Sequence, residues 1–465
     1  MAKPKKTLGL DNQGIQKTLY LGNHLGYGIA AISIQCIAMA TGMLTYFYTD
    51  KVGIAAATVG TILLVSKITD AVSDLGMGYI MDRTKTRWGK ARPWLLWMAI
   101  PAFIIIPAIF MLPAGAGSGV KTVYALVSNI LINTVVYTAI AIPFGSLVSF
   151  MTKSTEERTT LSLSRGVIAY IAAMGIYSAF IPATNALGGD QKAWIIVGII
   201  VGLVAMGSLL CAFFSVKELD FSGAEREEEE KISFSTSVKL LFQNKYWVMV
   251  LLVNFSVAIY GGLASGSSIY YTKWILKNEN LVALMGTITM LPTLVGFVIT
   301  KPLAKRIGVT KLIRIGFLIA VAASLVRAFF PYNFVIVLTF GTIASLGSGP
   351  YQILDRVLVT NTVEYGLWKS GKRMVGMVNS ASSFGMKIGG GIGAAMVGWI
   401  LARAGYDGAA ATQSSTAING ILLICFWLPV VIHVLCYLSL RLYDLDDKYP
   451  QIVKELEERA KRGSR

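Results

Sequence analysis

The sequence predicts an all-α membrane protein in which twelve transmembrane helices form two six-helix bundles. Hydrophobic residues make up 54% of the 465-residue chain and charged residues only 14%, whereas soluble domains carry about 25% charged residues. Windows such as 93–113 and 194–216 contain no charged residue, and they are long enough to cross roughly 30 Å of hydrocarbon. The longest interior hydrophilic segment, 217–239, separates the first six windows from the second six.

Each window is too long and too continuously apolar for a barrel strand, which has about ten residues of alternating polarity. We expect helices close to residues 24–47, 55–81, 93–113, 120–150, 159–181, 194–216, 243–271, 281–301, 311–330, 334–363, 373–402 and 416–440. The expected domains are an N-terminal bundle (1–216), a cytoplasmic middle loop (217–242), a C-terminal bundle (243–440) and a cytoplasmic tail (441–465).

Basic residues are distributed unevenly over the loops between these windows. Loop 82–92 has five basic residues against one acidic residue, and loop 301–314 has five and none. Loops 50–54 and 114–121 are nearly neutral. Because positively charged loops stay on the cytoplasmic side, we expect both termini in the cytoplasm. The net charge of +17 then reflects membrane topology, and we expect no nucleic-acid partner.

The basic loops follow the second and the eighth window, which are equivalent places in the two halves. This faint internal repeat is typical of transporters built from two repeated six-helix halves.

The cysteines and histidines offer no metal or redox chemistry. The four cysteines lie in apolar stretches without a CxxC pair, and His24 and His433 are isolated. They are typical of buried packing residues. HExxH and GxSxG motifs are absent from the sequence, so we expect neither an enzyme nor a resident cofactor.

Three polar residues lie together in the otherwise apolar window 55–81. Asp70, Ser73 and Asp74 share one helical face, because positions i, i+3 and i+4 do so, and Lys67 extends that face by one turn. An ionised side chain in mid-bilayer costs about 3 kcal/mol. The cluster therefore indicates a protein interior or a water-filled cavity. Two carboxylates and a hydroxyl suit a small cation or a proton, while a structural ion-pair network is the alternative.

Five segments resemble the glycoside–pentoside–hexuronide:cation symporters of the major facilitator superfamily (MFS). The segments are YFYTDKVG (46–53), SKITDAVSDLGMGYIMDRTKTRWGKARPW (66–94), IPFGSLVSFMTKSTEERTTLSLSRG (142–166), VEYGLWKSGKR (363–373) and SFGMKIGGGIG (383–393). The resemblance covers nearly the whole chain in the same order. It implies the major facilitator fold and symport of a sugar or glycoside with Na⁺, Li⁺ or H⁺ by alternating access.

The same resemblance implies roles for individual residues. Asp70, Asp74, Ser73 and Thr138 match the family's cation site, Lys387 matches a lysine near its carboxylates, and Arg165 matches a sugar-site arginine. Lys67 and Lys387 are the expected charge partners of the carboxylates. A headgroup contact or a gate ion pair is the alternative for Arg165, and snorkelling is the alternative for Lys387.

The sequence departs from the family's galactoside carrier at its sugar positions. Ala141 and Gly145 replace an aspartate and a tryptophan, Gln352 lies near another tryptophan position, and no acid is present near Gln35. We therefore expect a glucuronide-like substrate, with a neutral pentoside as second choice. A carrier for a lipid-like or other non-sugar solute is the alternative. Polar amides within the spans, such as Asn133, could line a cavity or join helices.

Charged residues at the cytoplasmic ends of both halves could close a gate. Arg83, Glu364 and Arg373 are the candidates, because topology alone does not explain the acidic residue among them. We expect a monomer in the bacterial inner membrane whose partners are the sugar, the coupling cation (Na⁺ or H⁺) and the lipid bilayer.

Overall fold

The computed structural model describes residues 9–10, 16–113, 115–152, 154–218, 234–372 and 374–463. Helices account for almost all of the described chain, and β-pairing within it is limited to two isolated bridges, Leu10 with Gln16 and Thr86 with Gly89. The all-α class is therefore confirmed. The chain divides into two compact units, Met1–Ala224 with Asp407–Ala411, and Glu225–Tyr406 with Thr412–Arg465.

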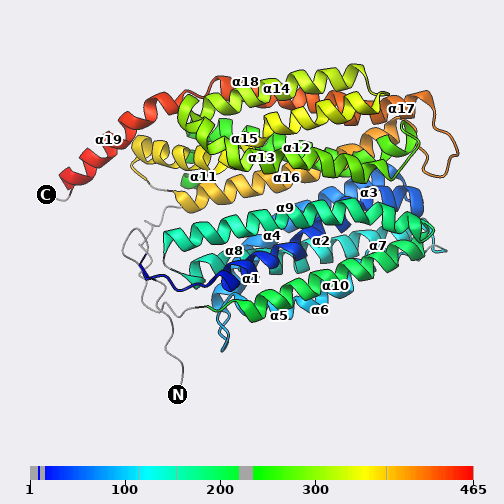
Figure 1. Cartoon of the computed structure of the whole chain (residues 1–465), viewed down its shortest axis with the longest axis horizontal. Helices are drawn as coiled ribbons and strands as arrows, with labels where there is room; N and C mark the ends of the chain where they lie inside the picture. Colours follow the sequence, from blue (N-terminus) through cyan, green and yellow to red (C-terminus); the bar gives the residue numbers. More distant parts are fainter. Residues whose placement is uncertain are drawn as a thin grey trace. The chain divides into compact units, whose positions relative to one another are not determined.

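The first unit contains six helical spans, several of which are built from consecutive shorter helices (Figure 1). In chain order its elements are α1 (Leu21–Ile29), α2 (Ala31–Gly42), α3 (Leu44–Tyr46), η1 (Phe47–Lys51), α4 (Ala56–Arg83), α5 (Arg92–Trp97), α6 (Ala99–Ala108), α7 (Ser118–Ile130), η2 (Leu131–Tyr137), α8 (Thr138–Met151), α9 (Thr155–Ala186) and α10 (Gln191–Ser215).

The second unit repeats this plan and adds a short helix before its first span and a longer one after its last. Its elements are α11 (Phe234–Gln243), α12 (Lys245–Trp274), α13 (Leu281–Ile307), α14 (Val309–Phe329), α15 (Phe334–Ser370), α16 (Val375–Arg403), α17 (Ser415–Leu422), η3 (Leu423–Trp427), α18 (Leu428–Arg441) and α19 (Leu445–Gly463). The added helices α11 and α19 lie in segments where the sequence predicted only a loop and a tail.

The lengths and hydropathies of these helices fit a multi-pass membrane protein. Within the described residues, ten helical stretches are long and apolar enough to cross a membrane. The bent pair Leu281–Gly296 and Val298–Ile307 makes an eleventh, and the shorter apolar stretch Arg92–Ala108 occupies the place of the predicted window 93–113. The predicted twelve spans are thus accounted for.

Helix breaks occur where the backbone hydrogen-bond ladder is interrupted. The 50° bend in α13 precedes Pro302, whose nitrogen cannot donate to the carbonyl of residue 298. In the fourth span, the π-helical turn η2 separates α7 from α8. Such turns re-aim side chains and occur often at functional sites.

Side-chain caps fix the start of several spans. Ser154, Asp190, Asn244 and Asn333 each accept a hydrogen bond from the backbone N–H three residues further along. These are the residue types that best satisfy the free N–H groups of a first turn.

The aromatic core of the first unit surrounds Trp194, which is almost fully buried. Its ring lies 5.2 Å from Phe47, 5.5 Å from Phe110 and 5.4 Å from Phe180, measured between ring centroids. These contacts join the first, third, fifth and sixth spans.

In the second unit, glycines allow α12 and α16 to pack backbone against backbone. A Cβ atom added at Gly393 would lie 2.2 Å from the Ile259 carbonyl oxygen, and one at Gly262 would lie 2.3 Å from the Gly390 carbonyl oxygen. Small residues are the usual means of close helix approach in membranes. The glycines of α16 therefore have a packing role in this unit.

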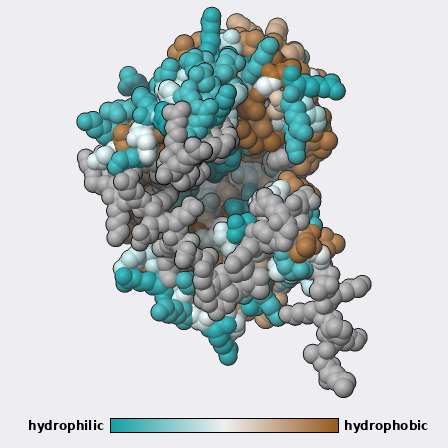
Figure 2. Space-filling view, turned by 90° about the vertical axis from the view of Figure 1, so that its left-hand side faces the viewer, coloured by the Kyte–Doolittle hydropathy of each residue, from teal (hydrophilic) through white to brown (hydrophobic). Residues whose placement is uncertain are grey.

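Hydrophilic side chains gather over the end of the second unit that carries α19 (Figure 2). This distribution agrees with a chain whose spans leave the membrane at that end.

We predict that Gly393→Ala lowers the free energy of unfolding by about 1–3 kcal/mol, because the added methyl group overpacks the contact with α12. The measurement is thermal unfolding of the purified protein in detergent. Gly390→Ala is the matched control, since its nearest neighbour would be 3.9 Å away. Equal stability of both variants would contradict the close-packing interpretation.

Candidate functional site

The helix α4 carries the two carboxylates that the sequence placed in the membrane. It packs against η2 and α8 of the same unit. The Asp70 side chain is buried, with 1% of its surface exposed, and the Ser73 hydroxyl donates to the Asp70 carbonyl oxygen at 3.0 Å. This contact holds the serine hydroxyl against the preceding turn of α4.

Thr138, the first residue of α8, joins the two carboxylates. Its hydroxyl lies 3.0 Å from Asp70 Oδ1, 3.2 Å from Asp74 Oδ1 and 3.3 Å from Ser73 Oγ. A hydroxyl carries a single hydrogen, so it donates to one of these oxygens at a time. The structure thus brings all four residues predicted for the cation site into one cluster of oxygen atoms.

Lys67 lies beside this oxygen cluster. Its ammonium nitrogen is 3.8 Å from Asp70 Oδ2 and donates to Asn133 Oδ1 at 3.1 Å. About a third of the lysine side chain is exposed, so its charge is partly solvated. The lysine is therefore shared between the carboxylate and an amide of the facing helix.

Asn133 is a member of the site whose contact with Lys67 the sequence did not predict. It lies in η2, and its side-chain nitrogen donates to Asn129 Oδ1 at 2.8 Å. The backbone carbonyl oxygen of Asn133 is 3.3 Å from the Thr138 hydroxyl. The π-turn offsets the fourth span by one residue, which a regular helical pattern does not reveal. In the sequence, the only sign that Asn133 belongs to the site is its polar amide within an apolar window.

Arg165 of α9 lies over the aromatic ring of Phe144 on α8. Its guanidinium carbon is 4.8 Å from the centre of the Phe144 ring. Phe144 in turn packs 4.6 Å from Tyr27, measured between ring centroids, and the Tyr27 hydroxyl donates to the Phe144 carbonyl oxygen at 3.2 Å. A guanidinium held over an aromatic face can still donate from its N–H groups to an anion or a hydroxyl.

The two fourth-span positions that depart from the galactoside carrier lie on α8. Ala141 is half-buried and Gly145 is exposed. A Cβ atom added at Gly145 would meet no atom within 4 Å. The space that a larger side chain would fill is therefore open in this chain. Gln35, on α2, is half-buried.

The remaining predicted residues lie elsewhere in the fold. Lys387 on α16 and Glu364 on α15 are half-buried in the second unit, and Gln352 on α15 is exposed. Arg83 ends α4 with its guanidinium 4.1 Å from the centre of the Tyr79 ring. Arg373 lies outside the described residues.

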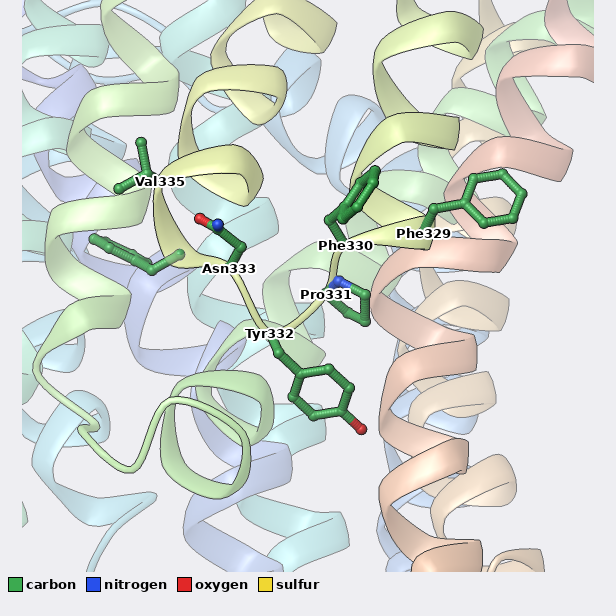
Figure 3. Close-up of a pocket in the computed structure, with 7 residues that line it drawn as sticks. Phe329, Phe330, Pro331, Tyr332, Asn333 and Val335 are labelled. Atoms are coloured by element: carbon green, nitrogen blue, oxygen red, sulfur yellow. The ribbon is translucent and has the colours of Figure 1, made fainter.

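A surface pocket in the second unit has a different character (Figure 3). It is lined by residues 329–335 between α14 and α15, whose side chains include Phe329, Phe330 and Tyr332. The Tyr271 hydroxyl donates to the Pro331 carbonyl oxygen at 2.5 Å and ties this loop to α12. Exposed aromatic residues at the end of a span are typical of the membrane interface, so this pocket is not a candidate for the chemistry of the carboxylates.

Comparison with known proteins agrees with this arrangement. The family model for MFS/sugar transport proteins matches residues 26–447. The chain is 34% identical over 429 residues to the isoprimeverose transporter of Lactiplantibacillus pentosus, covering 91% of this chain and 88% of that one. It is 29% identical over 453 residues to the glucuronide carrier protein homolog of Escherichia coli (strain K12), covering 94% and 95%.

Among solved structures, the fold is similar to that of a bacterial homologue of the human lysosomal transporter Spinster in its inward-facing, unoccupied conformation. The TM-score is 0.66 at 12% sequence identity, covering 92% of this chain and 97% of that one. The major facilitator fold and the resemblance to the glycoside–pentoside–hexuronide symporters are thereby confirmed. The chain belongs to the MFS/sugar transport protein family.

Proposed function

We propose that this protein is a symporter that couples the uptake of a glycoside, pentoside or hexuronide to a monovalent cation, Na⁺ or H⁺. The observation that carries this proposal is the oxygen cluster of Asp70, Asp74, Ser73 and Thr138 in the apolar spans α4 and α8. Ionisable residues within a membrane mark ion pathways. The names of two relatives, an isoprimeverose transporter and a glucuronide carrier homolog, support a sugar as the second solute.

The charges of the cluster explain how a cation couples to sugar binding. A monovalent cation that contacts both carboxylates offsets one of their two negative charges and binds both at once, whereas the single hydrogen of Thr138 bonds one carboxylate at a time. Lys67 and Lys387 are the groups that we assign to balancing the carboxylates when the cation is absent. If the loaded cluster favours the conformation that binds sugar tightly, then sugar must raise the cation affinity by the same factor.

The guanidinium of Arg165, which lies 4.8 Å from the centre of the Phe144 ring, favours an anionic sugar. Arg–carboxylate contacts are bidentate and stronger than contacts to neutral groups, and Gly145 leaves open space on α8. We therefore assign Arg165, Gln35, Ala141, Gly145 and Gln352 to sugar binding. A glucuronide or hexuronate is the first choice of substrate, and a neutral pentoside is the second.

We place the protein in a bacterial inner membrane with both termini in the cytoplasm, because its basic loops retain that side. The bundles 1–216 and 243–440, joined by loop 217–242 and followed by tail 441–465, are the proposed halves of a monomer. Arg83, Glu364 and Arg373 are the proposed gate residues.

Asp70→Asn and Asp74→Asn are each expected to abolish accumulation of sugar against a gradient, since each removes a charge that the cation needs. Both variants are still expected to exchange internal for external sugar, because this exchange requires no cation gradient. The measurement is uptake of a radiolabelled glucuronide into vesicles with an imposed Na⁺ or H⁺ gradient. Asp407→Asn, which changes a carboxylate in the exposed loop before α17, leaves accumulation unchanged. Normal accumulation by both Asp70 and Asp74 variants would refute the cation site.

Thr138→Val is expected to raise the cation concentration for half-maximal uptake about tenfold. This factor corresponds to the lower end of the roughly 1.5–3 kcal/mol contributed by a hydrogen bond to a charged group. Thr134→Val is the matched control, because the Thr134 hydroxyl lies in the same pair of spans and is 3.0 Å from Thr69 Oγ1. If both valine variants shift the cation dependence equally, Thr138 has no special part in cation binding.

Arg165→Ala is expected to weaken binding of a glucuronide about tenfold more than binding of the matched neutral glucoside, because a charge-assisted hydrogen bond contributes more than a neutral one. Competition against labelled substrate measures both affinities. Arg165→Lys keeps the charge but loses the planar fork, so it should restore part of the preference. Equal losses for the two sugars would remove the electrostatic role of Arg165.

A further inference from the structure

In the first unit, a carboxylate beyond the sixth span holds the start of the third. Glu218 lies three residues after the end of α10 and accepts hydrogen bonds from the backbone N–H groups of Lys90, Ala91 and Arg92 at 2.8, 2.8 and 2.5 Å. These groups precede or begin α5, where backbone donors have no partner within the helix. A negative charge is also favourable there, because the N-terminal end of a helix is positive.

The contact is reciprocal, because Arg92 of the third span holds the end of the sixth. Its Nε donates to the Phe213 carbonyl oxygen at 2.9 Å, and its guanidinium carbon lies 4.4 Å from the centre of the Phe213 ring. Carbonyl groups in a last helical turn lack helical partners, and a cation is favoured there. We call this pair of contacts the helix-end latch.

The second unit contains a latch of the same design between α14 and the end of α18. Asp446, five residues after α18, accepts from the Thr310 N–H in the first turn of α14 at 2.9 Å. Arg314 donates from Nε to the Leu440 carbonyl oxygen at 2.7 Å, and from Nη2 to the Tyr443 carbonyl oxygen. The same two spans of each unit are joined by an acidic and a basic residue in the same directions. A chance surface contact does not account for its occurrence in both units.

Gly89 makes the latch of the first unit sterically dependent on a glycine. It has a φ of +107°, and a Cβ atom there would lie 2.3 Å from the carboxyl carbon of Glu218. Gly308, before α14, has a φ of +89° but open space around it. Gly89 therefore both permits the turn and leaves room for the Glu218 carboxylate, whereas Gly308 only permits the turn.

We propose that Glu218 and Asp446 are positioning residues that lock the third and sixth spans of each unit together, so that each unit moves as one body during transport. This inference rests on the proposed transport function. The latch residues lie at the span ends that carry the basic loops, in elements separate from α4 and α8. Their loss therefore slows turnover, while the affinities for cation and sugar remain unchanged.

The first experiment measures amide hydrogen exchange of the full-length protein in lipid nanodiscs. Glu218→Ala raises exchange in peptide 88–96 at least tenfold and leaves peptide 308–316 unchanged, while Asp446→Ala has the opposite pattern. Glu156→Ala, which removes a half-exposed carboxylate paired with Lys17, changes neither peptide. Gly89→Ala reproduces the effect of Glu218→Ala although Glu218 is still present. Unchanged exchange of peptide 88–96 in Glu218→Ala would overturn the latch.

The second experiment measures transport by the same variants. Glu218→Ala and Asp446→Ala each lower the maximal rate of sugar exchange at least fivefold, and the half-saturating concentrations of cation and sugar stay within twofold of wild type. Glu218→Gln, which keeps the size and one acceptor oxygen, has an intermediate rate. A normal maximal rate, or a matching loss of affinity, would overturn the positioning role. The amide hydrogen-exchange measurement needs no substrate, so it still tests the latch if the wild-type chain transports no sugar.

Discussion

A carboxylate inside hydrocarbon must be compensated by neighbouring groups, and this constraint governs how the first unit is assembled. Asp70 is buried in a predominantly apolar span. The facing span supplies Thr138, and Lys67 of the same helix lies within 3.8 Å. Polar contacts therefore set the register of α4 against η2 and α8. Apolar packing alone would specify this register less well, because lipid tails are as apolar as the side chains that face them.

The positions of the spans and the shared face of the carboxylates could be predicted from the sequence, because both follow from local patterns. The window 55–81 is α4 at Ala56–Arg83, and the spacing of Asp70 and Asp74 fixes their face in any helix. The prediction that Thr138 belongs to the same site depended on the family resemblance. The contact of Asn133 with Lys67 depends on the π-turn η2, and a one-residue offset of this kind has no periodic signature.

The helix-end latches show a second limit of prediction from sequence. Glu218 belongs to a hydrophilic segment that the pattern identifies only as a linker, and Asp446 belongs to a charged tail. Their partners are backbone N–H groups 126 to 136 residues away in the chain. Every residue has such a group, so no motif identifies the partner. Only the packing of α10 on α5, and of α18 on α14, brings the carboxylates to a helix start.

The two kinds of polar contact differ in how they can respond to a ligand. Each latch carboxylate accepts donors that are fixed in the backbone, and no transported ion is needed to complete the contact. In the cluster of α4 and α8, one hydroxyl hydrogen serves two carboxylates in turn, whereas an arriving cation can serve both. In the proposed transport cycle, cation binding therefore changes the charge and the contacts of the cluster, while the proposed latches keep the contacts at the span ends. A symporter requires this division, because a local change of charge can shift a conformational equilibrium only if the surrounding helices transmit it without yielding.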